Sequence, residues 1–205
     1  MLTGCLGLLV SSASCGPVPP KVGDARPTAT ASAIASEAPP PDPDEGRAKT
    51  PYTKEQIRDA TPEGRSLTFV MESPDKPPVQ KRFRFLASDD ERTTIITELL
   101  DSNGKTVGDP ENVSSTWEEL RKHASFPKEA TTIEEVTAET PAGSFASWRY
   151  TVLETTDEGT KRTVAYFAKE LPGPPVDLSV EMNGQLLMTM TLIHYSAIKP
   201  TSDPE

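Results

Sequence analysis

The stretch Val176–Tyr195, VDLSVEMNGQLLMTMTLIHY, decides the fold of this chain. From Val176 to Met182, apolar and polar residues alternate with the period of two that is typical of a strand with one buried face. Asn183 and Gly184 follow, and this dipeptide is the strongest short signal for a tight hairpin turn. Gln185–Tyr195 then has the composition of a strand that pairs back. The stretch therefore predicts an antiparallel hairpin at the end of the chain.

The same pattern of strand and turn repeats upstream. Turns rich in Gly, Pro, Asp and Asn separate segments with strand periodicity. The predicted strands cover residues 66–72, 79–87, 93–100, a start at 105–107, 132–139, 144–154, 161–168, 176–182 and 185–195. About eight or nine strands in hairpin order predict a mainly β (α+β) fold, a single curved antiparallel meander sheet or half-barrel, because so long a sheet rarely stays flat.

Two short helices interrupt the strands. Thr53 with Gln56, and Thr116 with Glu119, have the spacing of a capping box, in which each side chain bonds to the other residue's backbone N–H. We expect helices over about 54–60 and 117–124. Trp117 lies at the start of the second helix, where it is an anchor against the sheet or, as an alternative, a residue that stacks on a ligand.

The region before the domain has a different composition. Residues 16–51 are rich in Pro, Ala, Ser and Thr, and they contain no aromatic residue. Such a segment buries too little apolar surface to offset the entropy of ordering, so we predict a disordered tether. The β-rich globular domain is expected to span residues 52–196, and a polar tail residues 197–205.

Composition excludes several classes of function. The 205-residue chain has a net charge of −10, which argues against nucleic acid as a partner. Both cysteines precede the tether, so the domain has no disulfide and no cysteine metal site. The two histidines, His123 and His194, lack metal-ligand spacing, and no phosphate-binding loop or nucleophile motif is present. We therefore expect no enzyme activity, no metal and no cofactor.

The final hairpin is unusually rich in methionine. Depending on the strand register, Met182, Met188 and Met190 can share one face with Leu186 and Leu192. Adaptable methionine-rich surfaces suit variable apolar ligands. With Trp117 and Met71, these residues form a candidate apolar ligand face, although ordinary core packing explains the same pattern.

The N-terminal stretch MLTGCLGLLVSSASCG, residues 1–16, resembles the end of a bacterial lipoprotein signal, with its apolar run, small residues and cysteine. The resemblance implies Cys15 as the lipid-bearing residue, carrying palmitate or a similar acyl chain, with Cys5 as the alternative. The basic start of such a signal is missing, so we expect the true start to lie upstream. Gly16 in place of Asp after Cys15 implies an outer-membrane destination.

The domain also resembles known periplasmic proteins. Pro141–Phe145, PAGSF, is similar to a segment that leads into a strand in uncharacterised periplasmic families. The curved sheet is similar to the half-barrel of the LolA/LolB lipoprotein carriers over about residues 63–196. This resemblance is one of architecture and identifies no functional residue.

Together these observations predict a lipoprotein of the bacterial cell envelope, anchored to the membrane and facing the periplasm or the cell surface. The expected function is a binding module that holds an apolar ligand or an acylated partner. The alternative is a structural or assembly lipoprotein that acts through contacts with other envelope proteins.

Overall fold

The structure is a computed structural model, and it describes residues 44–101 and 103–196. Several predicted features lie outside the described residues: Cys5, Cys15, the tether over residues 16–43 and the tail over residues 197–205. No helix in the part of the chain that is described is long and apolar enough to cross a membrane.

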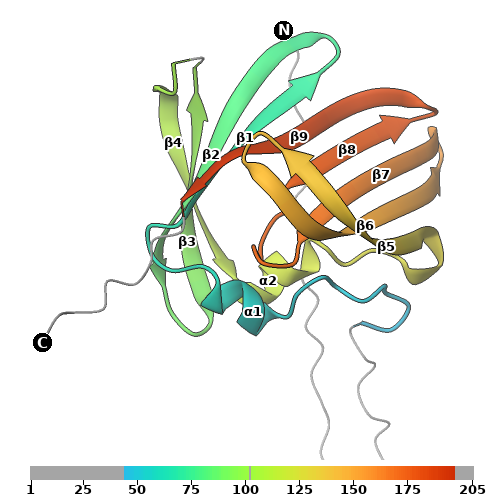
Figure 1. Cartoon of the computed structure of the whole chain (residues 1–205), viewed down its shortest axis with the longest axis horizontal. Coiled ribbons are helices and arrows are strands. Elements are labelled where there is room, and N and C mark those ends of the chain that lie inside the picture. Colours follow the sequence, from blue (N-terminus) through green and yellow to red (C-terminus); the bar gives the residue numbers. More distant parts are fainter. Residues whose placement is uncertain (1–43, 102, 197–205) are drawn as a thin grey trace, which may run out of the picture. The chain divides into compact units, whose positions relative to one another are not determined.

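A single antiparallel sheet of nine strands makes up the domain (Figure 1). Its order is β4-β3-β2-β1-β9-β8-β7-β6-β5, so every strand except β1 and β9 pairs only with its neighbours in sequence. The strands are β1 (Ser66–Ser73), β2 (Lys76–Ser88), β3 (Arg92–Leu100), β4 (Thr106–Thr116), β5 (Thr131–Thr140), β6 (Gly143–Thr156), β7 (Gly159–Ala168), β8 (Asp177–Met182) and β9 (Gln185–Ser196). The sheet curves but does not close, because β4 and β5 remain at its two edges. The predicted mainly β fold with a curved meander sheet is confirmed.

Two helices of six residues each, α1 (Lys54–Asp59) and α2 (Trp117–Lys122), lie at one end of the sheet (Figure 1). Both begin with a complete capping box, as predicted. In the second, the Glu119 N–H donates to the Thr116 hydroxyl at 3.1 Å, and the Thr116 N–H donates to the Glu119 carboxylate at 2.7 Å. A short 3-10 helix, Lys128–Ala130, then leads into β5.

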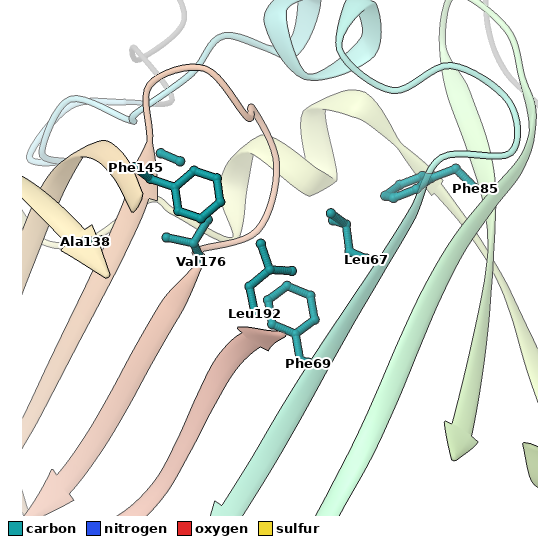
Figure 2. Close-up of a cluster of buried hydrophobic side chains, with 8 residues drawn as sticks. Leu67, Phe69, Phe85, Ala138, Phe145, Val176 and Leu192 are labelled. Carbon is teal, nitrogen blue, oxygen red and sulfur yellow. The ribbon is translucent and has the colours of Figure 1, made fainter. Parts of the chain in front are cut away.

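The core consists of two clusters of buried side chains. The first joins the centre of the sheet to β5 and β6 (Figure 2), and its members are Leu67, Phe69, Phe85, Ala138, Phe145, Ala168, Val176 and Leu192. The second lies beneath the helices and consists of Tyr52, Ile57, Trp117, Ala124, Tyr150, Ala165 and Phe167. Trp117 is 1% exposed, so the structure places it as an anchor in the core.

Prolines occur in two strands where the sequence indicated a turn or only the start of a strand. β4 contains Pro110, and β2 begins with Pro77 and Pro78 in its first three residues. Proline removes a backbone donor, so it is tolerated where a strand lacks a partner on one side. β4 is an edge strand, and β2 pairs with β3 only from Gln80 onward.

The packed domain begins earlier than residue 52. The Ala48 N–H donates to the Phe126 carbonyl at 2.9 Å, and the Tyr150 hydroxyl donates to the Lys49 carbonyl at 2.8 Å. Arg47 forms an isolated bridge with Pro127. The composition of residues 44–51 predicts that they belong to the tether, and this prediction is wrong: hydrogen bonds to their backbone, which composition does not reveal, hold them against the domain.

Candidate functional site

A partly open cavity of about 580 Å³ lies on the inner face of the curved sheet. Its walls come from both halves of the sheet, and α1, α2 and the loop after β7 contribute to its lining at the helical end. The lining residues are Ile57, Phe83, Phe85, Ile95, Thr97, Val113, Ser115, Leu120, His123, Ala124, Phe126, Glu154, Lys161, Thr163, Ala165, Phe167, Gly173, Pro174, Pro175, Leu178, Val180 and Met190.

The strand register explains how distant segments reach this cavity. Phe85 of β2 pairs with Ile95 of β3, and Ala165 of β7 pairs with Leu178 of β8. Paired residues of neighbouring strands project from the same face of a sheet. The curvature then brings the inner face of β2–β4 opposite the inner face of β7–β9.

The lining of the cavity is predominantly apolar. Four phenylalanines and several aliphatic side chains form most of the wall, and hydroxyl groups come from Thr97, Ser115 and Thr163. The only charged side chains that line it, among the described residues, are Glu154 and Lys161, whose charged atoms lie 3.5 Å apart. A cavity of this size and composition is typical of a site for an apolar ligand.

A buried arginine lies beside the cavity at its helical end. Arg65 is 2% exposed, and its Nη1 donates to the Thr61 hydroxyl at 2.9 Å and to the Pro172 carbonyl at 2.7 Å. Its Nη2 is buried and has no hydrogen-bond partner within residues 44–101 and 103–196. Burial lowers the pKa of Arg65 to about 10, so the guanidinium remains protonated at neutral pH.

Gly173 separates this guanidinium from the cavity. The glycine lines the cavity, and a Cβ built on it would lie 3.6 Å from Nη2 of Arg65. Its φ of +146° is a conformation that residues with side chains rarely adopt. A residue that lines the cavity, and that has no side chain, thus lies against the buried guanidinium.

The predicted ligand face is divided by the structure. Met190 lines the cavity. Met71 pairs with Met190, Met188 pairs with Val180 and Met182 pairs with Lys161, so these methionines share the inner face without lining the cavity. Leu192 and Trp117 lie in the core clusters.

Leu186 faces outward, away from the methionines. Val180 of β8 pairs with Met188, but the next residue, Glu181, pairs with Leu186, so β9 contains one extra residue at this point. Such a β-bulge reverses the alternation of side chains. Leu186 consequently projects from the outer face, and it is 43% exposed.

Sequence reasoning missed Arg65 and the phenylalanines of the cavity as site residues. Arg65 follows Gly64 in a segment with the composition of a turn, where an exposed arginine is the ordinary expectation. No local sequence pattern predicts the burial of Arg65, because neighbouring groups come from Tyr52, Pro172 and Gly173. No three His, Cys, Asp or Glu side chains in the described part of the domain are placed to hold a metal ion.

The sequence matches no protein-family model and no curated protein. Solved structures that are similar to the fold include the following three. One is a protein of Bacteroides fragilis, inferred to be exported and having a YmcC-like fold, with a TM-score of 0.43, 11% identity, and coverage of 67% of this chain and 97% of that one. Another is a protein of Parabacteroides distasonis, inferred to be a lipoprotein, with a TM-score of 0.43, 9% identity, and coverage of 73% and 99%.

The third similar structure is MucB, with a TM-score of 0.46 and 13% identity; the match covers 72% of this chain and 58% of MucB. At these levels of identity, the three structures do not identify a ligand or an activity for this chain.

Proposed function

We propose that this protein is an envelope lipoprotein that binds the apolar part of a ligand within its curved sheet. The observation that carries the proposal is the apolar cavity of about 580 Å³ between two walls of the same sheet. Contact between water and apolar surface of this extent is unfavourable. A ligand that covers the surface therefore binds with a free energy that grows with the apolar area that protein and ligand remove from water. The lipoprotein-like N-terminal stretch supports a place at the membrane, where such ligands are abundant.

Blocking the cavity tests the binding function. Val180 lines the cavity, so Val180→Trp should fill part of it, whereas Leu187→Trp adds the same side chain at an exposed position near the hairpin tip. We expect the full-length protein to enhance the fluorescence of N-phenyl-1-naphthylamine, Val180→Trp to lose most of this signal and Leu187→Trp to retain it. Equal signals from both variants, or no signal from the parent, would contradict the proposal.

The nature of the natural ligand needs a separate measurement. Native mass spectrometry of the protein purified from its own envelope should show a bound lipid or acylated molecule, which Val180→Trp should lack. If the parent protein carries no additional mass under conditions that preserve noncovalent complexes, the cavity does not hold a tightly bound apolar ligand.

The lipid anchor is part of this proposal, although both cysteines lie outside the described residues. Labelled palmitate supplied to cells should enter the parent protein. Loss of label in Cys15→Ala, but not in Cys5→Ala, identifies Cys15 as the acylated residue. Absence of label in the parent would contradict the anchor.

Contacts with other envelope proteins are a second candidate function, favoured by the exposure of β4. This edge strand is 11 residues long and mostly exposed, and Val107 on it is 55% exposed. Exposed edges pair readily with strands of other proteins. Crosslinking in intact cells from a residue introduced at position 107 should yield one reproducible partner; a variant with the crosslinker at exposed position 187 is the control.

A further inference from the structure

We infer that the cavity takes an amphiphile with an anionic head group, a carboxylate or a phosphate, and that Arg65 binds this head group. The inference rests on the proposed binding function and specifies the chemical class of the ligand.

The first observation is that Arg65 is a buried charge without a counter-charge. It forms no salt bridge with any carboxylate of the described residues. Two neutral oxygens, from Thr61 and Pro172, accept hydrogen bonds from its Nη1. The Nη2 donor remains unused. A buried ion that lacks a partner of opposite charge is strongly unfavourable, so an arginine at this position indicates an anion supplied from outside the domain.

The neighbouring tyrosine does not supply that anion. Tyr52 interacts electrostatically with Arg65, but its hydroxyl donates a hydrogen bond of 2.6 Å to the Ala168 carbonyl. Burial holds the pKa of the Tyr52 phenol well above its usual range, so the ring stays neutral. The positive charge of Arg65 is therefore not compensated by any charged group within residues 44–101 and 103–196.

The position of Arg65 connects this charge to the cavity. The guanidinium lies against Gly173, which lines the cavity and presents no side chain between the two. Glu154 and Lys161 do line the cavity, but their opposite charges compensate each other, because the Lys161 Nζ lies 3.5 Å from a carboxylate oxygen of Glu154. His123 also lines the cavity. Beside the cavity, behind Gly173, Arg65 is the charge that lacks a counter-charge among the described residues, and it favours an anionic head group.

An apolar wall and a buried cation together select an amphiphile. The phenylalanines can hold an alkyl chain, and the unused Nη2 of Arg65 can donate a charge-assisted hydrogen bond to an oxygen of a carboxylate or phosphate. Without the cation, an anion would bind less well than a neutral molecule of equal length, because it must lose its hydration. A comparison of the affinities for an anion and for a neutral molecule of equal length therefore shows whether the cation contributes to binding.

Displacement of N-phenyl-1-naphthylamine by dodecanoate, dodecyl phosphate and dodecanol tests the inference on the full chain. We expect at least one of the two anions to bind roughly tenfold or more tightly than dodecanol, as charge-assisted hydrogen bonds imply. In Arg65→Met the order should reverse in favour of the alcohol, and Arg65→Lys should retain the preference for an anion. Arg84→Met is the control, because it also removes an arginine, but one that has a carboxylate partner in Glu98 at 3.7 Å.

The outcomes separate this inference from the proposed function. Equal binding of the anions and dodecanol by the parent, or an unchanged order in Arg65→Met, overturns the role of Arg65 while apolar binding stands. Failure of all three molecules to bind contradicts the proposed function itself. The anion that binds more tightly identifies the head group.

A measurement on the parent protein alone covers the case in which Arg65→Met does not fold. The carboxyl carbon of bound, ¹³C-labelled dodecanoate can be titrated by NMR. A bound pKa below that of the free acid in dilute solution supports pairing with the guanidinium, whereas a raised pKa indicates an apolar environment without a cation and overturns the inference.

Discussion

The indole nitrogen of Trp117 donates a hydrogen bond of 2.9 Å to the carbonyl oxygen of Asp89. The Trp117 backbone N–H also donates to the Glu91 carbonyl, at 3.0 Å. The first residue of α2 is thus attached to the turn between β2 and β3. This attachment sets the position of Leu120 and Ala124, which line the helical end of the cavity.

Replacing Trp117 should destabilise the domain. In Trp117→Phe the Asp89 carbonyl loses its partner and a small void remains, so we expect the free energy of unfolding to fall by roughly 1–3 kcal/mol. Urea unfolding followed by circular dichroism measures the change. Trp148→Phe, at a half-buried tryptophan, is the control and should cost less. An equal effect of the two variants would argue against a special role for the Trp117 contact.

Asn183 should stabilise the tips of two hairpins at once. Its φ is +52°, its side-chain oxygen accepts from the Thr160 N–H at 2.9 Å, and its amide nitrogen donates to the Glu158 carbonyl at 3.0 Å. We expect Asn183→Gly to lower the free energy of unfolding by about 1 kcal/mol through the lost hydrogen bonds. Asn183→Ala should cost about 1 kcal/mol more, because alanine is strained at positive φ.

The comparison of the two Asn183 variants in urea is the critical measurement. If alanine is tolerated better than glycine, backbone conformation does not limit this turn. Gly159→Ala offers a further check: a Cβ there would overlap the Asn183 side chain, and the φ of Gly159 is +124°. The substitution should therefore lose the same two bonds and add backbone strain, so it should cost more than Asn183→Gly.

Acid should weaken the domain partly through Glu98. Its carboxylate accepts a hydrogen bond from Arg82 Nε at 2.9 Å, and this bond holds the pKa of Glu98 below its usual range. A lowered pKa in the folded state stabilises the fold above the unfolded-state value of about 4.3, and this stabilisation is lost as the pH falls through the folded pKa.

The variant Glu98→Gln isolates this contribution. We expect the parent to be more stable than the variant at pH 7, and the difference in unfolding free energy to shrink as the pH is lowered below about 4.3. Urea unfolding at several pH values gives both curves. A difference that does not depend on pH would mean that the glutamate acts through its shape and not its charge.

Residues 44–51 should contribute to stability. A chain that begins at Tyr52 lacks the hydrogen bonds made by Ala48 and Lys49. We therefore expect its free energy of unfolding to be roughly 1–3 kcal/mol lower than that of a chain that begins at Asp44. A double-mutant cycle with Tyr150→Phe tests the specific contact, since this variant should cost more in the longer chain. Equal costs in both chains would show that the hydrogen bond from Tyr150 to Lys49 contributes nothing.

Local chemistry accounts for what the sequence predicted well. Capping residues at Thr53 and Thr116 located both helices, and turn residues such as Asn183 and Gly184 located the hairpins. These signals act over two to four residues, so they can be read without knowledge of the tertiary structure. Because almost every strand pairs with its neighbour in sequence, the hairpins also determined the sheet.

The features that escaped prediction depend on distant contacts. The bulge beside Leu186 has no local signal, yet it reversed the face on which that side chain lies. The cavity forms between β2–β4 and β7–β9, which only the curvature of the folded sheet brings together. The burial of Arg65 depends likewise on residues more than a hundred positions away, at Pro172 and Gly173.

The pairing of β9 with β1 affects how the protein folds. Among the nine strands of the described residues, β1 and β9 are the only partners that are distant in sequence, and β9 is the last of the nine along the chain. Until β9 pairs, β1–β4 and β5–β8 can form two separate four-stranded sheets, each with unpaired edges. Contacts between distant segments form slowly, so we expect the pairing of β9 with β1 to limit the rate of folding and the unpaired edges to be exposed to aggregation until it forms.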